Sequence, residues 1–189
     1  NLMNFRGLKL NIFSGLRTLL SRWKREDDAL AAIEAAMIFP IMLVLLVGVF
    51  DAGNAILADQ KTIRASQVVA DLVSRQNVVT QADIDEAIEA GRLAFEPLNS
   101  SSYGVDIVSI RFDEDANSEI VWRDTVNMPP VPDPLGAVSA LEEADEGVVM
   151  VSVVYDYEPL FVGFVMTAFQ MQEVAFSRGR STPVITKVP

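Results

Sequence analysis

The longest apolar pattern in the chain lies near its N-terminus. Residues 29–50 contain one charged side chain, Glu34, among 22 residues. As a helix rising ~1.5 Å per residue, this segment is about 33 Å long, which is enough to cross the hydrocarbon core of a bilayer. The pattern therefore predicts a transmembrane helix. The alternative is a cleaved secretory signal with Gly53 and Ala55 as its small residues, but the apolar stretch is long for a signal and Glu34 is unusual inside one.

After Phe50 the pattern becomes that of an amphipathic helix, with apolar residues on one stripe. One continuous helix over 29–76 is the simplest interpretation. The stripe has to be covered, either by copies of the same helix in an assembly or by the chain's own globular domain, and the periodicity favours neither. Its predicted members are Ile56, Ile63, Ala65, Val68, Val69, Leu72 and Val73.

Residues 77–189 have the pattern of a small α+β domain. Thr80, three residues before Asp83, begins a helix that Pro97 should stop. Residues 148–157 are apolar on both alternating faces, which predicts an interior strand of an antiparallel sheet. A Pro-rich loop precedes a weak helical pattern at 137–145. Further strands are predicted at 105–112 and 119–124, which form a hairpin, and at 170–178.

Charge divides the chain into three parts: a basic leader at 1–28, the helix at 29–76 and an acidic domain at 77–189. Residues 51–189 carry 9 basic and 22 acidic side chains, a net charge of −13. Basic flanks stay in the cytoplasm, so the leader is predicted to be cytoplasmic and the domain to lie outside. The acidic domain would repel phosphates, which argues against a nucleic-acid partner. The leader's basic residues are Arg6, Lys9, Arg17, Arg22, Lys24 and Arg25.

Candidate chemistry is sparse. The chain has no Cys and no His, which excludes disulfides, thiolate zinc sites and the usual catalytic triads. Asp113, Asp115 and Asn117 have the spacing of a calcium loop, but Ser118 replaces the required Gly and the flanks alternate like strands. An acidic hairpin turn explains these residues better than a calcium site. No catalytic residue, metal ligand or cofactor is therefore predicted, and the protein is not expected to be an enzyme.

The N-terminal residues carry a resemblance to a known family. A basic leader followed by LAAIEAAMIFPIMLVLLVGVFDAGNAI resembles TadE-like minor pseudopilins of the tight-adherence (Tad) pilus, a branch of the type IV pilus systems. The matching features are Glu34 early in the span, Pro40 after it and the small polar residues that follow. The segment VSVVYDYEPLF and the closing Arg178 and Arg180 are also similar.

This resemblance implies a single-pass protein of the bacterial inner membrane that works in pilus assembly. The implied partners are other pilins and pseudopilins, the assembly platform and a prepilin peptidase. If the chain is processed, the resemblance places the cleavage between Ala29 and Leu30. It also implies that Glu34 acts in assembly by pairing with the freed N-terminal amine of a neighbouring subunit.

Physical reasoning about the span leaves several interpretations open. A carboxylate costs about 2.5–3.5 kcal/mol at the centre of a span and less near its edge, so Glu34 either has a partner or extends to the cytoplasmic interface. Pro40 removes a backbone donor and is predicted to kink the helix. The alternative function is a single-pass envelope protein whose acidic outer domain binds a ligand or partner. Asn1 as the first residue suggests a fragment or a start upstream of Met3.

Overall fold

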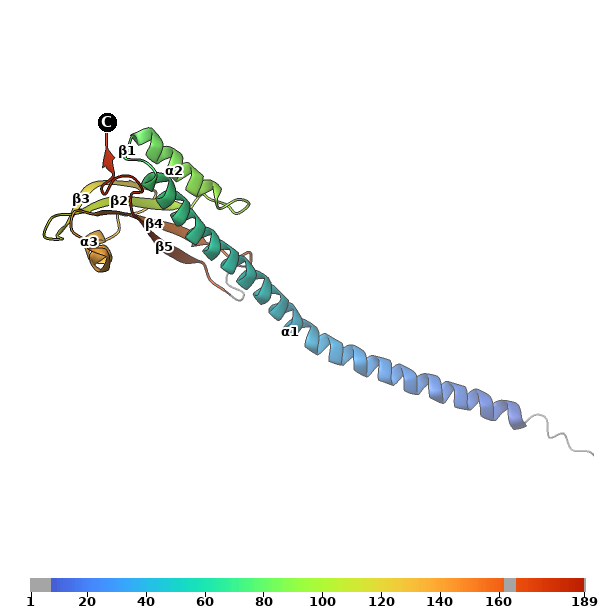
Figure 1. Cartoon of the computed structure of the whole chain (residues 1–189). Helices are drawn as coiled ribbons and strands as arrows, with labels where there is room; N and C mark the ends of the chain where they lie inside the picture. The colour runs from blue at the N-terminus through green and yellow to red at the C-terminus, as the bar shows by residue number, and fades with distance from the viewer. Residues whose placement is uncertain (1–7, 162–165, 189) are drawn as a thin grey trace, which may run out of the picture. The chain divides into compact units, whose positions relative to one another are not determined.

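The computed structural model describes the backbone of residues 8–161 and 166–188, and the side chains of 29–161 and 166–188. It contains a long N-terminal helix followed by a small domain with an antiparallel four-stranded sheet, which confirms the predicted α+β class (Figure 1). The chain divides into two compact units, Asn1–Val49 and Phe50–Pro189. The side chains of the basic leader at 1–28 lie outside the described residues.

The N-terminal helix α1 spans Leu8–Ser74, 67 residues, and continues through Pro40. Its backbone is already helical at Leu8, well before the apolar segment that predicted it. From Ala29 onward it contains an apolar stretch long enough to cross a membrane. Among residues 8–161 and 166–188 it is the one helix of this kind, which suggests a single-pass membrane protein.

The second half of α1 belongs to the domain and packs on it through one stripe. The chain's own domain therefore covers the stripe, because the apolar residues of the stripe share one core cluster with the sheet. The prediction that Ile56 belongs to the covered stripe is wrong, because Ile56 is 61% exposed and its neighbour Ala55 is buried instead. Small side chains dominate because they let the helix backbone approach the sheet closely. The buried residues are Asp51, Ala55, Ala58, Thr62, Ala65, Ser66, Val69, Ala70, Val73 and Ser74.

Four antiparallel strands form the sheet in the order β3-β2-β4-β5. The hairpin of β2 (Gly104–Phe112) and β3 (Ser118–Val126), the interior strand β4 (Gly147–Tyr157) and the closing strand β5 (Phe169–Ser177) confirm the predicted strands. Alternate residues of β4 enter two separate cores. Val149, Val151 and Val153 face the α1 side, whereas Val148 and Met150 join a smaller cluster with Val138.

The helix α2 (Gln81–Leu93) lies beside the second half of α1 (Figure 1). It begins with the predicted capping box, in which Thr80 Oγ1 accepts from the Asp83 amide and Asp83 accepts from the Thr80 amide. After Leu93 a turn leads to Pro97, and Lys61 of α1 donates to the carbonyl oxygens of Ala94 and Glu96. This lysine compensates the negative end of α2.

The predicted helix at 137–145 is mostly wrong. The structure instead has a short helix α3 (Pro134–Val138) and a 3₁₀ turn η1 (Ser139–Leu141). The helix starts earlier because Pro134 suits the first turn and the Asp133 side chain accepts from the Gly136 amide. The sequence also did not predict the parallel pairing of β1 (Val78–Val79) with β6 (Thr186–Lys187), whose strands are only two residues long.

Candidate functional site

The first candidate region is the apolar part of α1 that lies in the N-terminal unit. Every side chain from Ala29 to Leu46 is exposed. Large apolar residues such as Leu30, Ile33 and Met37 are more than half exposed. A helix that is apolar on all sides and uncovered requires either lipid or other helices around it.

The predicted processing and assembly residues all lie on this exposed part of α1. Ala29 and Leu30 are in regular helix, and the Glu34 side chain is exposed one turn further along. Within residues 29–161 and 166–188, Glu34 has no hydrogen bond or ion pair. Pro40 lies inside the helix. The cleavage, the pairing of Glu34 and the kink at Pro40 stay predictions.

The second candidate region is the point where α1 enters the domain, and its central residue is Asp51. This side chain is fully buried. Its Oδ1 accepts a hydrogen bond from the Leu160 amide at 3.2 Å, and its backbone oxygen accepts one from the Tyr157 hydroxyl at 2.9 Å. Its Oδ2 has no partner among the described residues. Asp51 therefore attaches the end of β4 and the segment after it to the first turn of the domain's helix.

Sequence reasoning did not identify Asp51, although a signal was present. It is the only charged residue between Glu34 and Asp59. A lone charge directly after an apolar span is typical of the end of a membrane segment, so local pattern alone does not single it out. The burial of this charge depends on residues more than 100 positions later in the chain, which no local pattern reveals.

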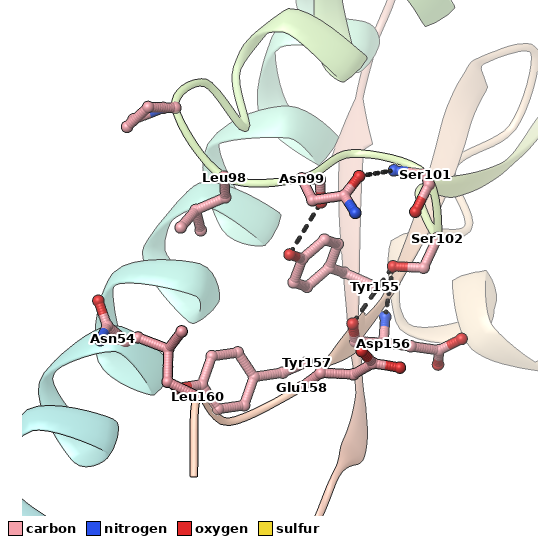
Figure 2. A pocket seen from close by; sticks show the side chains of 11 residues that line it. Asn54, Leu98, Asn99, Ser101, Ser102, Tyr155, Asp156, Tyr157, Glu158 and Leu160 are labelled. Atoms are coloured by element: carbon pink, nitrogen blue, oxygen red, sulfur yellow. Dashed lines mark hydrogen bonds between the residues drawn. The ribbon is translucent and has the colours of Figure 1, made fainter. Parts of the chain in front are cut away.

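A groove of about 410 Å³ lies next to this region, between α1, the loop after α2 and the end of β4 (Figure 2). Several of its polar groups make hydrogen bonds within the domain. The Tyr155 hydroxyl donates to the Asn99 oxygen, and Ser102 Oγ is hydrogen-bonded to both the amide and the oxygen of Asp156. The lining residues are Asn54, Pro97, Leu98, Asn99, Ser101, Ser102, Tyr155, Asp156, Tyr157, Glu158 and Leu160.

The acidic turn between β2 and β3 is held together by its own side chains. Asp113 Oδ1 accepts from the amides of Asp115 and Asn117, and the Asn117 side chain donates to both Asp113 oxygens. These hydrogen bonds, first those from Asn117, lower the pKa of Asp113. The arrangement is an Asx-type turn, as the hairpin interpretation predicted. Within residues 29–161 and 166–188, no group of three or more acidic side chains has a metal-binding arrangement.

The comparisons with known proteins concern the helix. Residues 30–71 match the family model described as TadE-like protein. No curated protein and no solved structure matches the chain significantly. The matched residues include Glu34, Pro40, Asp51 and most of the buried stripe of α1. Residues 30–71 are therefore a TadE-like segment, which confirms the resemblance predicted for the N-terminal helix; the similarity at VSVVYDYEPLF, Arg178 and Arg180 lies outside the matched residues and stays a prediction.

Proposed function

We propose that this protein is a minor pseudopilin-like structural and assembly component of a Tad-type surface pilus, anchored in the inner membrane by one helix. The observation that carries the proposal is the coincidence of two features in α1. The segment that matches the TadE-like family begins at residue 30, and its first part, residues 30–46, is apolar, exposed throughout and contains Glu34. An uncovered apolar helix with one carboxylate near its start suits lateral packing against other helices in a membrane.

The proposed arrangement places the basic leader in the cytoplasm and the domain outside the membrane. The leader has six basic residues before the span, whereas only Lys61, Arg64 and Arg75 follow within 25 residues. This difference favours a cytoplasmic N-terminus. In this proposal the protein works by assembly with other pilins and an assembly platform, and it is not an enzyme.

The role of Glu34 provides the test. In a piliated strain, Glu34→Ala should insert into the membrane at least as well as wild type, because a charge that lipid disfavours has been removed. The number of pili should nevertheless fall, because the subunit has lost its ionic contact with a neighbour. Glu34→Lys should reduce piliation further, since a cation would then face the neighbour's amine. Immunoblots of membrane fractions and counts of pili by electron microscopy measure the two effects separately.

Controls separate the proposal from the alternative function. Ser66→Ala, in the domain half of α1, is the matched control because it changes a small residue away from Glu34. Mass spectrometry of the mature chain should find Leu30 as its first residue. Normal piliation in both Glu34 variants, together with an uncleaved leader in a strain with active peptidase, would contradict the proposal. That result would favour an envelope protein whose outer domain binds a partner, for which the groove in Figure 2 is a candidate site.

A further inference from the structure

The apolar surface of α1 does not end where its sequence pattern ends. Asp51 is the only charge between Glu34 and Asp59, and its side chain is turned into the domain and fully buried. The large exposed side chains around it are apolar, whereas the half-buried Asn54 is polar. Phe50, Ile56 and Leu57 are all substantially exposed, Ile56 at 61%. The uncovered face of the helix therefore stays largely apolar beyond Asp51 as far as Leu57.

Three exposed apolar residues from a later part of the chain, Leu160, Phe161 and Phe169, lie at the end of the domain that contains Asp51. The Leu160 amide donates to Asp51 Oδ1, so Leu160, which is 69% exposed, and its neighbour Phe161 are held beside the start of the domain's helix. The Phe169 ring contacts the Tyr157 ring at 5.5 Å between centroids. The Tyr157 hydroxyl in turn donates to the Asp51 oxygen.

We propose that these residues form an apolar collar that enters the interface of the bilayer, so that the domain is partly embedded in the membrane rather than held above it. The proposal rests on the membrane anchoring by α1. The collar comprises Phe50, Ile56, Leu57, Leu160, Phe161 and Phe169.

Length and continuity with the span identify lipid as the partner. The 28 residues from 30 to 57 are about 42 Å long as a helix, longer than a hydrocarbon core of about 30 Å but close to the 40–45 Å of a bilayer with its interfaces. The collar is continuous in the chain with the span, since Phe50 is the last residue of the apolar segment. Exposed apolar and aromatic side chains at this level gain free energy by entering the region between headgroups and acyl chains.

The strand β5 offers a matched pair of positions to test this. Phe169 and Phe176 are 41% and 42% exposed. Phe169 is opposite Tyr157 in the sheet and Phe176 is opposite Met150, so they lie at opposite ends of the strand. The chain has no Cys, so Phe169→Cys and Phe176→Cys each provide a single labelling site. The full-length variants are labelled with the fluorophore NBD and reconstituted in phosphatidylcholine vesicles, some of which carry a nitroxide on the upper acyl chain.

The lipid nitroxide should quench the label at Phe169→Cys at least about threefold more than the label at Phe176→Cys, because only the former reaches the acyl boundary. Leu160→Cys and Ile56→Cys should behave like Phe169→Cys, which protects the result against misfolding of one variant. A label at Met42→Cys, inside the span, reports on the anchoring itself and should be quenched in the same vesicles.

Three results would overturn the collar. Quenching at Phe169→Cys that does not exceed quenching at Phe176→Cys would show that the Phe169 end of the strand is not selectively at the acyl boundary. A blue-shifted Phe169→Cys label that lipid nitroxide does not quench means that a second copy of the chain covers the collar instead of lipid. No quenching at Met42→Cys would refute the membrane anchoring and the collar together, whereas quenching at Met42→Cys alone would refute only the collar.

Discussion

At the scale of single residues, a close contact between α1 and α2 depends on Gly91. A Cβ added at Gly91 would lie 2.4 Å from the Tyr103 hydroxyl and 2.6 Å from Val69 Cγ2. Both neighbours are buried. Gly91→Ala should therefore destabilise the domain by about 1–3 kcal/mol through overpacking, although Ala is intrinsically the better helix former. Urea unfolding of the detergent-solubilised protein, followed by circular dichroism, measures this change.

Tyr103→Phe is the matched control for that variant. The Tyr103 hydroxyl is buried without a hydrogen-bond partner among the described residues, and burial raises the pKa of this phenol. Removing the hydroxyl should leave stability unchanged or slightly higher. In the double variant, Tyr103→Phe should restore part of the stability lost in Gly91→Ala, because the close contact with the Tyr103 hydroxyl has gone. If the changes in unfolding free energy of the two single variants simply add in the double variant, the Tyr103 hydroxyl does not cause the clash.

Asp106 is a buried carboxylate whose hydrogen bonds attach the Pro-rich loop to the sheet. Its oxygens accept from Arg123, from the Thr125 hydroxyl at 2.7 Å and from the Val131 amide at 2.9 Å. Burial opposes the charge, but these hydrogen bonds, chiefly that of Arg123, outweigh it and lower the pKa of Asp106. The carboxylate is therefore stabilised in its ionised form.

Asp106→Asn should cost about 3 kcal/mol at pH 7, because it leaves the Arg123 guanidinium without its anion. Since the pKa is lowered on folding, the stability from ionised Asp106 is complete above its ordinary value of 3.8 and is lost as the pH falls through the lower folded value. The urea midpoint of wild type should fall in this acidic range more than that of Asp106→Asn. The exposed Asp85→Asn is the control, and parallel pH curves for all three proteins would contradict the assignment.

At the scale of elements, α1 has two different roles along its length. Residues 29–46 are exposed throughout, whereas six apolar residues of the second half lie in the main core with the sheet and α2. These are Ala55, Ala58, Ala65, Val69, Ala70 and Val73. The domain therefore needs the second half of the helix as one of its layers, since this core would otherwise be open to water.

This predicts where the chain can be shortened. A fragment of residues 50–189 should unfold cooperatively, whereas residues 77–189 should lack cooperative unfolding and bind hydrophobic dyes, because the α1 layer of the core is missing. Urea titrations followed by tryptophan fluorescence make the comparison. Trp122 is a suitable probe because its ring is buried and its Nε1 donates to the Ile185 oxygen. A cooperative transition in 77–189 with the same midpoint would show that the helix is only a tether.

At the scale of the whole molecule, the uneven distribution of charge predicts the orientation in the membrane. Alkaline phosphatase fused after residue 76 should be active, and the same enzyme fused after residue 25 should be inactive, because the basic leader stays in the cytoplasm. Green fluorescent protein at the same positions should give the opposite pattern. Phosphatase activity at residue 25 would reverse the orientation.

Strong local patterns predicted most of the fold. The alternation of β4, the capping box before α2 and the β2–β3 hairpin are local signals, and each element lies where it was expected. The weak helical pattern at 137–145 gave a wrong prediction, because the helix begins at Pro134, where the Asp133 side chain caps its first turn. The stripe of α1 was only partly predicted, since close packing selected small side chains such as Ala55 that have little hydrophobic signal.

The sequence by itself determined the apolar span, the acidic α+β domain and the likeness to TadE-like proteins, because these depend on composition and on local periodicity. Only the tertiary structure decided which face of α1 is covered and what happens to Asp51. Local pattern places Asp51 at the end of the span, because a charge is costly in lipid. Folding brings Tyr157 and Leu160 onto it and turns the charge inward, which leaves the outward surface apolar as far as Leu57. Burial depends on distant residues, so local periodicity does not encode it.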